Sequence, residues 1–258
     1  MDRSSDKLYH KHHHDSRTLL ETYFSRNPDR AFKDDTLRAP MEKLRKAFNM
    51  GHLTGKLLID ISAGPLIHHL YFACEYFQEI ILMRTNEQCI IEIMEWHDDR
   101  TRAFCWEHMT AHVTNLEGRS DECEEKEMKL KSAITHVMKF DFELENLTDP
   151  IGVPLADCVI TTLLLDKICK DQNDYMRILR KILTFLKPGG HLISLGVTNT
   201  SMVGGHRFYC FTYDEHFARD ALVREGMTIL QCEVTPRKSE SPVSDFGGVL
   251  FIIACKQK

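Results

Sequence analysis

Residues 57–65 constrain the fold of this chain most, because they predict a buried strand that runs directly into a turn of small residues and then a helix. Their sequence is Leu-Leu-Ile-Asp-Ile-Ser-Ala-Gly-Pro. A nearly continuous apolar run is typical of a central strand in a parallel sheet, where both faces are covered. Ser62 and Gly64 allow a ligand to approach the backbone closely, and Pro65 suits the first turn of a helix. The segment predicts a site for a nucleotide-like ligand, with a ligand-free strand, turn and helix as the alternative.

Strands and helices are predicted to alternate as far as residue 196, which is typical of a doubly wound, mostly parallel sheet. Residues 106–118 are ambiguous and allow a short strand, and the Lys-Pro-Gly-Gly sequence at 187–190 predicts a tight turn. The further apolar runs that predict strands lie at residues 80–83, 137–142, 156–162 and 191–195, and the helical patterns lie at residues 66–76, 86–97, 121–138 and 173–186.

Beyond residue 196 the order of predicted elements changes. Residues 207–211 predict a short extra strand and residues 214–225 a helix. Two last strands, at residues 228–234 and 249–255, are separated by a polar loop with two prolines and two glycines. We expect them to form an antiparallel pair at the edge of the sheet.

The first 50 residues predict two helices that precede the sheet. Apolar residues at helical spacing over 18–24 end in Tyr23 and Phe24, which predicts a short helix with an aromatic pair on one face. The polar segment 27–35 predicts a mobile link, and the sequence Ala-Pro-Met at 39–41 predicts the start of a second helix.

Residues 1–16 are predicted to be a flexible tail. The tail carries histidines at positions 10, 12, 13 and 14, but it offers them no acid or thiol at a fixed geometry. Since metal sites in proteins need such a fixed ligand set, we predict no metal site.

Composition narrows the class of protein. The 258 residues are 43% hydrophobic, enough to bury a sizeable core, and the net charge of −5 with dispersed cations predicts no nucleic-acid or membrane surface. Nine cysteines without a Cys-x-x-Cys pair predict a reducing compartment and argue against a disulfide framework or a zinc knuckle. With no signal peptide and no run of about 18 apolar residues, we expect a soluble cytoplasmic protein.

Ligands of doubly wound sheets bind beyond the carboxyl ends of the strands. Small residues, acids, an aromatic ring and hydroxyl groups occupy these positions and suit an adenosine. They are Ser62, Gly64, residues 84–87, Asp141, Phe142, Thr161 and Thr162. Two cofactors fit this set, a nicotinamide dinucleotide and S-adenosylmethionine. Because the turn has one glycine and not the Gly-x-Gly-x-x-Gly of a dinucleotide site, methyl transfer is favoured, with a dehydrogenase as an alternative.

The chain from residue 19 to residue 254 resembles the nicotinamide, phenylethanolamine and indolethylamine N-methyltransferase family. The resemblance rests on several segments, the first of which matches the family's Asp-Ile-Gly-Ser-Gly-Pro except for Ser62. They are Asp-Ile-Ser-Ala-Gly-Pro at 60–65, Ala-Cys-Glu-Tyr-Phe-Gln-Glu-Ile at 73–80, residues 92–96, Leu-Glu-Gly at 116–118, Ala-Asp-Cys-Val at 156–159 and Leu-Lys-Pro-Gly-Gly-His at 186–191.

The resemblance implies an α/β, Rossmann-like class I methyltransferase that uses S-adenosylmethionine. It implies one domain over residues 17–258, with an antiparallel edge strand and an N-terminal helical lid at about 17–50. The acceptor would be a small amine, pyridine or thioether, and the protein a monomer. The implied cofactor-binding residues are Tyr23, Phe24, Asp60, Ser62, Gly64, Pro65, Glu87, Asp141, Phe142 and Thr162. No catalytic side chain is assigned.

Four positions depart from the family pattern. Ser62 replaces a glycine, Arg84 stands where the family has an acid for the ribose, Cys89 replaces an asparagine and His68 a tyrosine. The acid after the fifth strand is also missing, with Gly-Val-Thr at 196–198. We expect Arg84 to face the cofactor sulfonium and to repel it by about 2 to 3 kcal/mol at 6 Å. The alternative function is therefore a family member that has lost cofactor binding and serves as a binding or regulatory protein.

Overall fold

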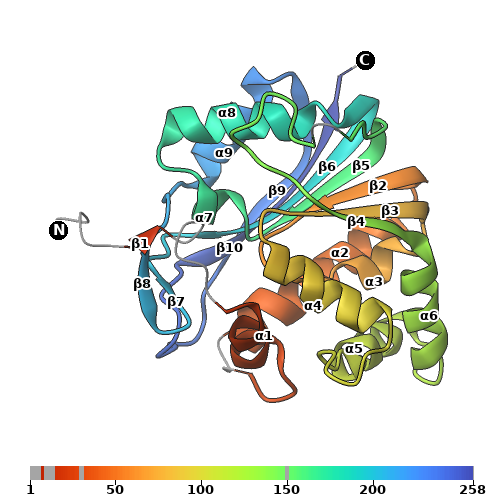
Figure 1. Cartoon of the computed structure of the whole chain (residues 1–258). Helices are drawn as coiled ribbons and strands as arrows, with labels where there is room; N and C mark the ends of the chain where they lie inside the picture. The colour runs from red at the N-terminus through yellow and green to blue at the C-terminus, as the bar shows by residue number, and fades with distance from the viewer. Residues whose placement is uncertain (1–6, 9–14, 29–31, 149–150, 258) are drawn as a thin grey trace.

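The computed structural model describes residues 7–8, 15–28, 32–148 and 151–257, and the predicted histidine cluster of the tail lies outside these residues. A seven-stranded sheet forms its centre, in the order β4-β3-β2-β5-β6-β10-β9 (Figure 1). Its strands are β2 (Gly55–Ile61), β3 (Phe77–Arg84), β4 (Ile134–Lys139), β5 (Ala156–Thr162), β6 (Leu186–Thr198), β9 (Met227–Pro236) and β10 (Gly248–Lys256). Strand β10 runs antiparallel between β6 and β9, which confirms the predicted antiparallel pair.

Helices cover both faces of the sheet (Figure 1). One face carries α1 (Ser16–Phe24), the π-helix η1 (Phe32–Arg38), α2 (Ala39–Asn49), α3 (Leu70–Ala73), α4 (Glu87–His97), α5 (Glu107–Glu117) and α6 (Cys123–Ala133). The other face carries α7 (Leu165–Ile168), α8 (Gln172–Leu183) and α9 (Glu215–Arg224). Leu58 of β2 packs in the first core and Ile59 in the second. Burial on both faces explains the unbroken apolar run of this strand.

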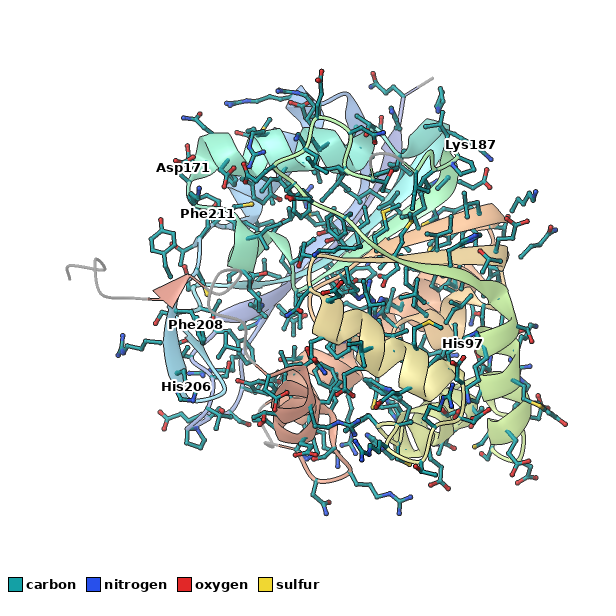
Figure 2. All side chains as sticks on the ribbon, viewed as in Figure 1. His97, Asp171, Lys187, His206, Phe208 and Phe211 are labelled. Carbon is teal, nitrogen blue, oxygen red and sulfur yellow. The ribbon has the colours of Figure 1, made fainter. Side chains whose placement is uncertain are left out.

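A second, small sheet has the order β1-β8-β7 and consists of β1 (Lys7–Leu8), β7 (Met202–Val203) and β8 (His206–Tyr209). Figure 2 shows His206 and Phe208 on this sheet, on the opposite side of the molecule from Lys187 near the start of β6. The small sheet therefore lies beside the carboxyl end of β6, and its strand β7 begins four residues after β6 ends. Within the described residues, no helix is both long and apolar enough to cross a membrane.

Several predicted elements differ from those observed. Residues 107–117 form helix α5 and not a strand, because Met109 and Val113 are buried one turn apart and Gly118, at a φ of +75°, ends the helix. The predicted helix at 66–76 is only the single turn α3, and the predicted helix at 121–138 ends at residue 133, where β4 begins.

Two predicted loops also belong to regular elements. The Lys-Pro-Gly-Gly sequence lies inside the long strand β6, where Gly189 has a φ of +79° and the register with β5 shifts. An irregularity of the strand therefore replaces the expected turn. The described end of the predicted link, at 32–35, belongs to helix η1.

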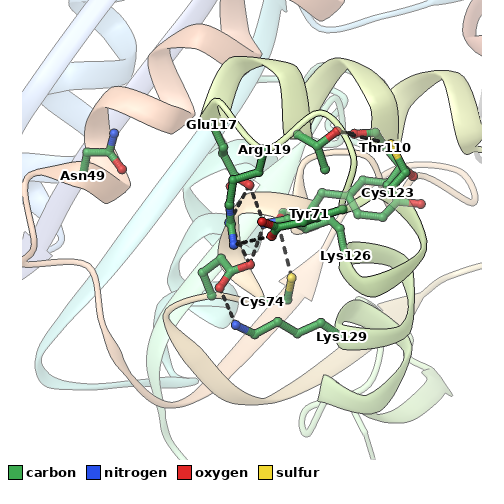
Figure 3. A network of polar contacts seen from close by, with 12 residues as sticks. Asn49, Tyr71, Cys74, Thr110, Glu117, Arg119, Cys123, Lys126 and Lys129 are labelled. Atoms are coloured by element: carbon green, nitrogen blue, oxygen red, sulfur yellow. Dashed lines mark hydrogen bonds and ion pairs between the residues drawn. The ribbon is translucent and has the colours of Figure 1, made fainter.

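A buried charge network fastens α5 and α6 to the turn after α3 (Figure 3). The side chain of Lys126 is 1% exposed, and its Nζ lies 2.6 Å from carboxylate oxygens of both Glu75 and Glu117. Arg119 and Lys129 also pair with Glu75. Burial alone would raise the pKa of Glu75, but the hydrogen bonds and charges of Lys126 and Lys129 lower it to about 2. The network holds these helices on the first face of the sheet.

Candidate functional site

The candidate site lies where the order of the strands reverses, between β2 and β5, at the carboxyl edge of the sheet. The backbone N–H of Ala63 donates to the Thr162 carbonyl at 2.9 Å, and the N–H of Thr162 donates to the Ser62 hydroxyl at 3.0 Å. These bonds join the turn after β2 to the end of β5. Gly64 has a φ of +64°, which a residue with a side chain adopts only with strain.

Ser62 has a structural reason to replace the smaller glycine of the family pattern. Besides accepting from Thr162, its hydroxyl donates to Oδ1 of Asp60 at 2.6 Å. Asp60 is fully buried, and its Oδ1 is also 2.8 Å from Nε2 of His69. The serine therefore links the acid of β2 to the backbone of β5.

Arg84 points into the protein, so the expectation that it faces a bound sulfonium is wrong. Its Nη2 lies 2.6 Å from Oδ2 of Asp60 and also donates to the Leu66 carbonyl at 2.8 Å. Its Nη1 donates to the carbonyls of Met83 and Asp60. The charge of Arg84 is thus compensated by Asp60 inside the core, where the side chain is 1% exposed.

The Asp60 carboxyl is ionised in this network. Burial by itself would raise its pKa, but the Arg84 charge, His69 and the hydrogen bonds from His69 and Ser62 lower it to about 2. Asp60 is therefore bound to three side chains, those of Ser62, His69 and Arg84, and stabilises the turn after β2 from inside the core.

Helix α1 covers the turn after β2. The nearest δ-carbon of Leu19 is 3.6 Å from the position that a Cβ atom on Gly64 would take. At the start of the helix, the Ser16 hydroxyl lies 3.2 Å from the thiol of Cys89 on α4. Nη2 of Arg17 is 2.8 Å from Oε2 of Glu92, also on α4. Cys89, one of the departures from the family pattern, is therefore part of the contact between the lid and the body.

Tyr23 and Phe24 hold the end of α1 against two other parts of the chain. The Tyr23 hydroxyl donates to the Val243 carbonyl at 2.8 Å and accepts from the backbone N–H of Gly204. The ring of Phe24 lies 5.0 Å from that of His68, between centroids. His68 is buried, and desolvation, followed by the influence of His69, lowers its pKa well below the ordinary value.

The other predicted residues lie along the same edge but apart from this contact. Glu87 is exposed in the first turn of α4, and Asp141 is exposed in the loop after β4. Phe142 is buried on the second face, with its ring centroid 4.7 Å from that of Phe140. Pro65 is buried in the turn after β2. The structure thus brings together the turn, Thr162 and the lid aromatics, while the ligand roles of all ten residues stay predictions.

Sequence reasoning missed a small cavity next to the turn, of about 40 Å³. It is lined by Leu19, Tyr23, Phe24, Ala63, Leu66, Leu163, Lys167, Val197, Thr200, Met202, Val203, Ser244 and Phe246. Lys167 and the loop after β6 were not predicted to be part of a site. Their only signal in the sequence is that they follow the carboxyl ends of predicted strands.

Comparisons with known proteins agree with this geometry. Residues 4–257 match the model of the NNMT/PNMT/TEMT family, and the chain belongs to that family. It is 32% identical to mouse indolethylamine N-methyltransferase over 242 residues, covering 92% of this chain and 90% of the relative. It is 32% identical to human nicotinamide N-methyltransferase over 246 residues (95% and 93%), and 30% identical to human phenylethanolamine N-methyltransferase over 222 residues (83% and 78%).

Solved structures share the fold at low sequence identity. The magnesium protoporphyrin IX methyltransferase ChlM from Synechocystis with bound SAM aligns with a TM-score of 0.55 at 13% identity, covering 93% of this chain and 90% of that one. The N-methyltransferase NodS from Bradyrhizobium japonicum with S-adenosyl-L-homocysteine aligns with a TM-score of 0.53 at 11% identity (95% and 100%). The predicted class I methyltransferase fold and the predicted family are confirmed. The chain is accordingly a methyltransferase of the type that uses S-adenosylmethionine.

Proposed function

We propose that this protein transfers a methyl group from S-adenosylmethionine to a nitrogen or sulfur atom of a small molecule, namely an amine, a pyridine or a thioether. The observation that carries the proposal is the glycine turn after β2, which is bonded to the end of β5 and covered by the aromatic lid helix α1. A site of this kind encloses a small ligand and does not present a surface to a macromolecule.

The residues at the edge suit this cofactor. The hydroxyls of Thr161 and Thr162 are buried without a hydrogen-bond partner in the described part of the chain, so they have donors and acceptors to offer a ligand. Asp141 and Glu87 offer exposed carboxylates for the ribose hydroxyls. In this proposal Gly64 and Thr162 lie against the methionine part, and Phe142 lies near the adenine. When bound, S-adenosylmethionine supplies an electrophilic methyl group on a cationic sulfur.

The chain contributes mainly by positioning. Tyr23, Phe24 and Leu19 would close over both reactants and exclude water, and the turn at 62–64 would fix the donor against the sheet. Holding two reactants in line accounts for a large part of the acceleration of a bimolecular transfer. A general base is needed only for an acceptor that arrives protonated.

We further propose that residues 17–258 act as one methyltransferase domain whose lid comprises about residues 17–50, and that it works as a monomer in the cytosol. The contacts of α1 with α4 and with the 204 and 243 segments support a lid that belongs to the same unit as the sheet. Size-exclusion chromatography with light scattering tests the monomer.

Titration calorimetry tests the cofactor. We expect S-adenosylmethionine and S-adenosylhomocysteine to bind at micromolar concentration and NAD not to bind. Transfer of labelled methyl groups to a panel of amines, pyridines and thioethers then tests the reaction. Absence of binding at millimolar ligand would overturn the proposal, and binding without transfer to any acceptor would favour a regulatory or binding protein.

A further inference from the structure

The cavity beside the turn lies on the half of the sheet away from the two carboxylates proposed for the ribose, those of Glu87 and Asp141. Leu163 follows β5, Val197 lies at the end of β6, and Phe246 precedes β10, whereas Glu87 and Asp141 follow β3 and β4 on the other half. Ala63 in the turn after β2 forms the boundary between the two halves. This cavity is therefore in position to receive the methyl acceptor.

The lid helix forms one wall of the cavity. A volume of about 40 Å³ is smaller than the roughly 150 Å³ that a benzene-sized ligand occupies in a protein cavity. An acceptor with a ring can enter only if the cavity enlarges, and Leu19 and Tyr23 of α1 lie on the wall that the lid helix forms. The remaining walls come from the sheet edge, from the loops after β5 and β6, and from the loop before β10.

Among the described residues that line the cavity, Lys167 is the only one that is charged at neutral pH. Its side chain is 8% exposed, and its Nζ lies 2.7 Å from Oδ2 of Asp166. Asp166 is fully buried and does not line the cavity. Among the described residues, Asp166 is the only hydrogen-bond partner of the ammonium group, which leaves donor capacity for a ligand.

The carboxylate of Asp245, which lies in sequence between the lining residues Ser244 and Phe246, is already hydrogen-bonded through both of its oxygens. Oδ1 of Asp245 accepts from the backbone N–H groups of Ser201 and Met202 at 2.8 Å each and from the Thr200 hydroxyl at 3.2 Å. Its Oδ2 accepts from the Ser201 hydroxyl at 2.6 Å. Asp245 therefore holds the loop after β6 in place and does not line the cavity.

The end of β6 cannot supply an acid either. A Cβ atom on Gly196 would lie 2.7 Å from the hydroxyl of buried Tyr213, so no side chain fits at position 196 without a shift. The cavity consequently offers a cation and three hydroxyl-bearing residues, Tyr23, Thr200 and Ser244. Among the residues that the structure describes, it offers no carboxylate to pair with a protonated amine.

We propose that Lys167 makes this cavity selective for acceptors that are uncharged at the reacting atom and carry an anionic substituent, and that it excludes ammonium groups. The proposal rests on the proposed methyltransferase function and specifies its acceptor. The lone pair of a pyridine-type nitrogen forms the new N–C bond as the methyl–sulfur bond breaks. The electron pair of that bond stays on sulfur, and the positive charge passes to the ring. No proton leaves, so the lack of a base in the cavity is no obstacle.

Three pyridines of the same shape test the proposal. Pyridine-3-carboxylate, pyridine-3-carboxamide and 3-(aminomethyl)pyridine share the reacting nitrogen and differ in the charge of the substituent. Binding is measured by calorimetry at saturating S-adenosylhomocysteine, and kcat/KM by methyl transfer. We expect the carboxylate to bind at least ten-fold more tightly than the ammonium compound, with the carboxamide in between. Equal or reversed affinities would overturn the selectivity.

Variants assign the selectivity to Lys167. The pair Asp166→Asn with Lys167→Met removes both charges and leaves no unpaired ion, and we expect it to abolish the preference for the carboxylate. Lys167→Arg should retain the preference, and Lys170→Met, an exposed lysine of the same segment, should leave all three affinities unchanged. Thermal unfolding checks that each variant is folded.

The two proposals fail differently. Absence of S-adenosylhomocysteine binding overturns the methyltransferase function itself. Normal binding and transfer with a preference for the ammonium compound, or a carboxylate preference that survives the double substitution, overturns only the role of Lys167.

Discussion

The guanidinium of Arg84 and the carboxylate of Asp60 form a buried ion pair at the ends of two adjacent parallel strands, with Nη2 and Oδ2 2.6 Å apart. Both side chains are withdrawn from solvent, and the remaining hydrogen bonds of Arg84 go to backbone carbonyls. Inside the protein, each charge has the other and nearby polar groups as partners in place of water. It therefore stabilises this edge of the sheet only as long as both members are present.

Removing the arginine alone should destabilise the protein strongly. We expect Arg84→Met to lower the free energy of unfolding by about 3 to 5 kcal/mol, because it leaves the Asp60 carboxylate buried without its cation. Arg84→Asp should be at least as damaging, since it places two carboxylates together. The double variant Arg84→Met with Asp60→Asn should recover most of the loss. Urea unfolding measures all three, and a double variant no more stable than Arg84→Met would contradict the pairing.

The ionised Asp60 should also appear in the pH dependence of stability. Its pKa is lowered to about 2 in the folded protein, against about 3.9 in an unfolded chain. Its contribution is therefore present above pH 4 and is lost as the pH falls towards 2. In Asp60→Asn, the free energy of unfolding should depend less on pH between about pH 4 and pH 2. The same pH dependence in the variant as in the unchanged protein would refute the assignment.

Tyr23→Phe should loosen the lid. The substitution removes the hydrogen bonds to the Val243 carbonyl and from the Gly204 N–H, and we expect a loss of about 1 to 2 kcal/mol in lid docking. We expect S-adenosylhomocysteine to dissociate about 5- to 30-fold faster, as measured by stopped-flow displacement. Tyr76→Phe, which removes a hydroxyl bonded to Asn49 away from the site, is the matched control and should leave the rate unchanged.

Buried His68 should make stability fall in mildly acidic solution. Desolvation and the neighbouring His69 lower the pKa of His68 in the folded protein. As the pH falls, His68 therefore binds a proton at a higher pH in the unfolded chain than in the folded protein. The contribution of neutral His68 is present above about pH 6.5 and is lost as the pH falls towards the lowered value, by up to about 1.4 kcal/mol per pH unit. His68→Phe should reduce this slope, whereas His216→Gln, on the exposed face of α9, should not.

Lys126→Met should weaken the attachment of helices α5 and α6 to the turn after α3. The variant leaves Glu75 and Glu117 without their shared buried cation, and we expect a loss of about 3 kcal/mol in the free energy of unfolding. Lys129→Met is the control, because Lys129 is half exposed and pairs with Glu75 from outside. Similar losses in the two variants would argue against a special role for the buried lysine.

Much of the fold could be predicted because local patterns and topology agree. The apolar run of β2, the small-residue turn and the alternation of strands and helices each point to a doubly wound sheet. The errors fall where tertiary contacts override local signals. Helix α5 has two buried threonines, which favour strands in isolation, but their hydroxyls bond back to carbonyls of the preceding turn.

The site was harder to predict, because a residue's position at the end of a strand does not determine which groups a long side chain reaches. Arg84 ends β3 as predicted, yet it turns inward because Asp60 on the neighbouring strand offers a buried partner. Ser62 departs from the family pattern but gains two hydrogen bonds, which no single-sequence rule anticipates. The role of Lys167 depends on a cavity whose walls come from five separate segments of the chain.

The two bonds of the Tyr23 hydroxyl set the order in which the newly made protein can become functional. Its partners lie 181 and 220 residues further along the chain. At a synthesis rate of 5 to 20 residues per second, the N-terminal helix waits about 10 to 45 s before its last docking partner exists. Until the segments around residues 204 and 243 have been made, the cavity lacks the walls that they form, so the enclosed site is complete only near the end of synthesis.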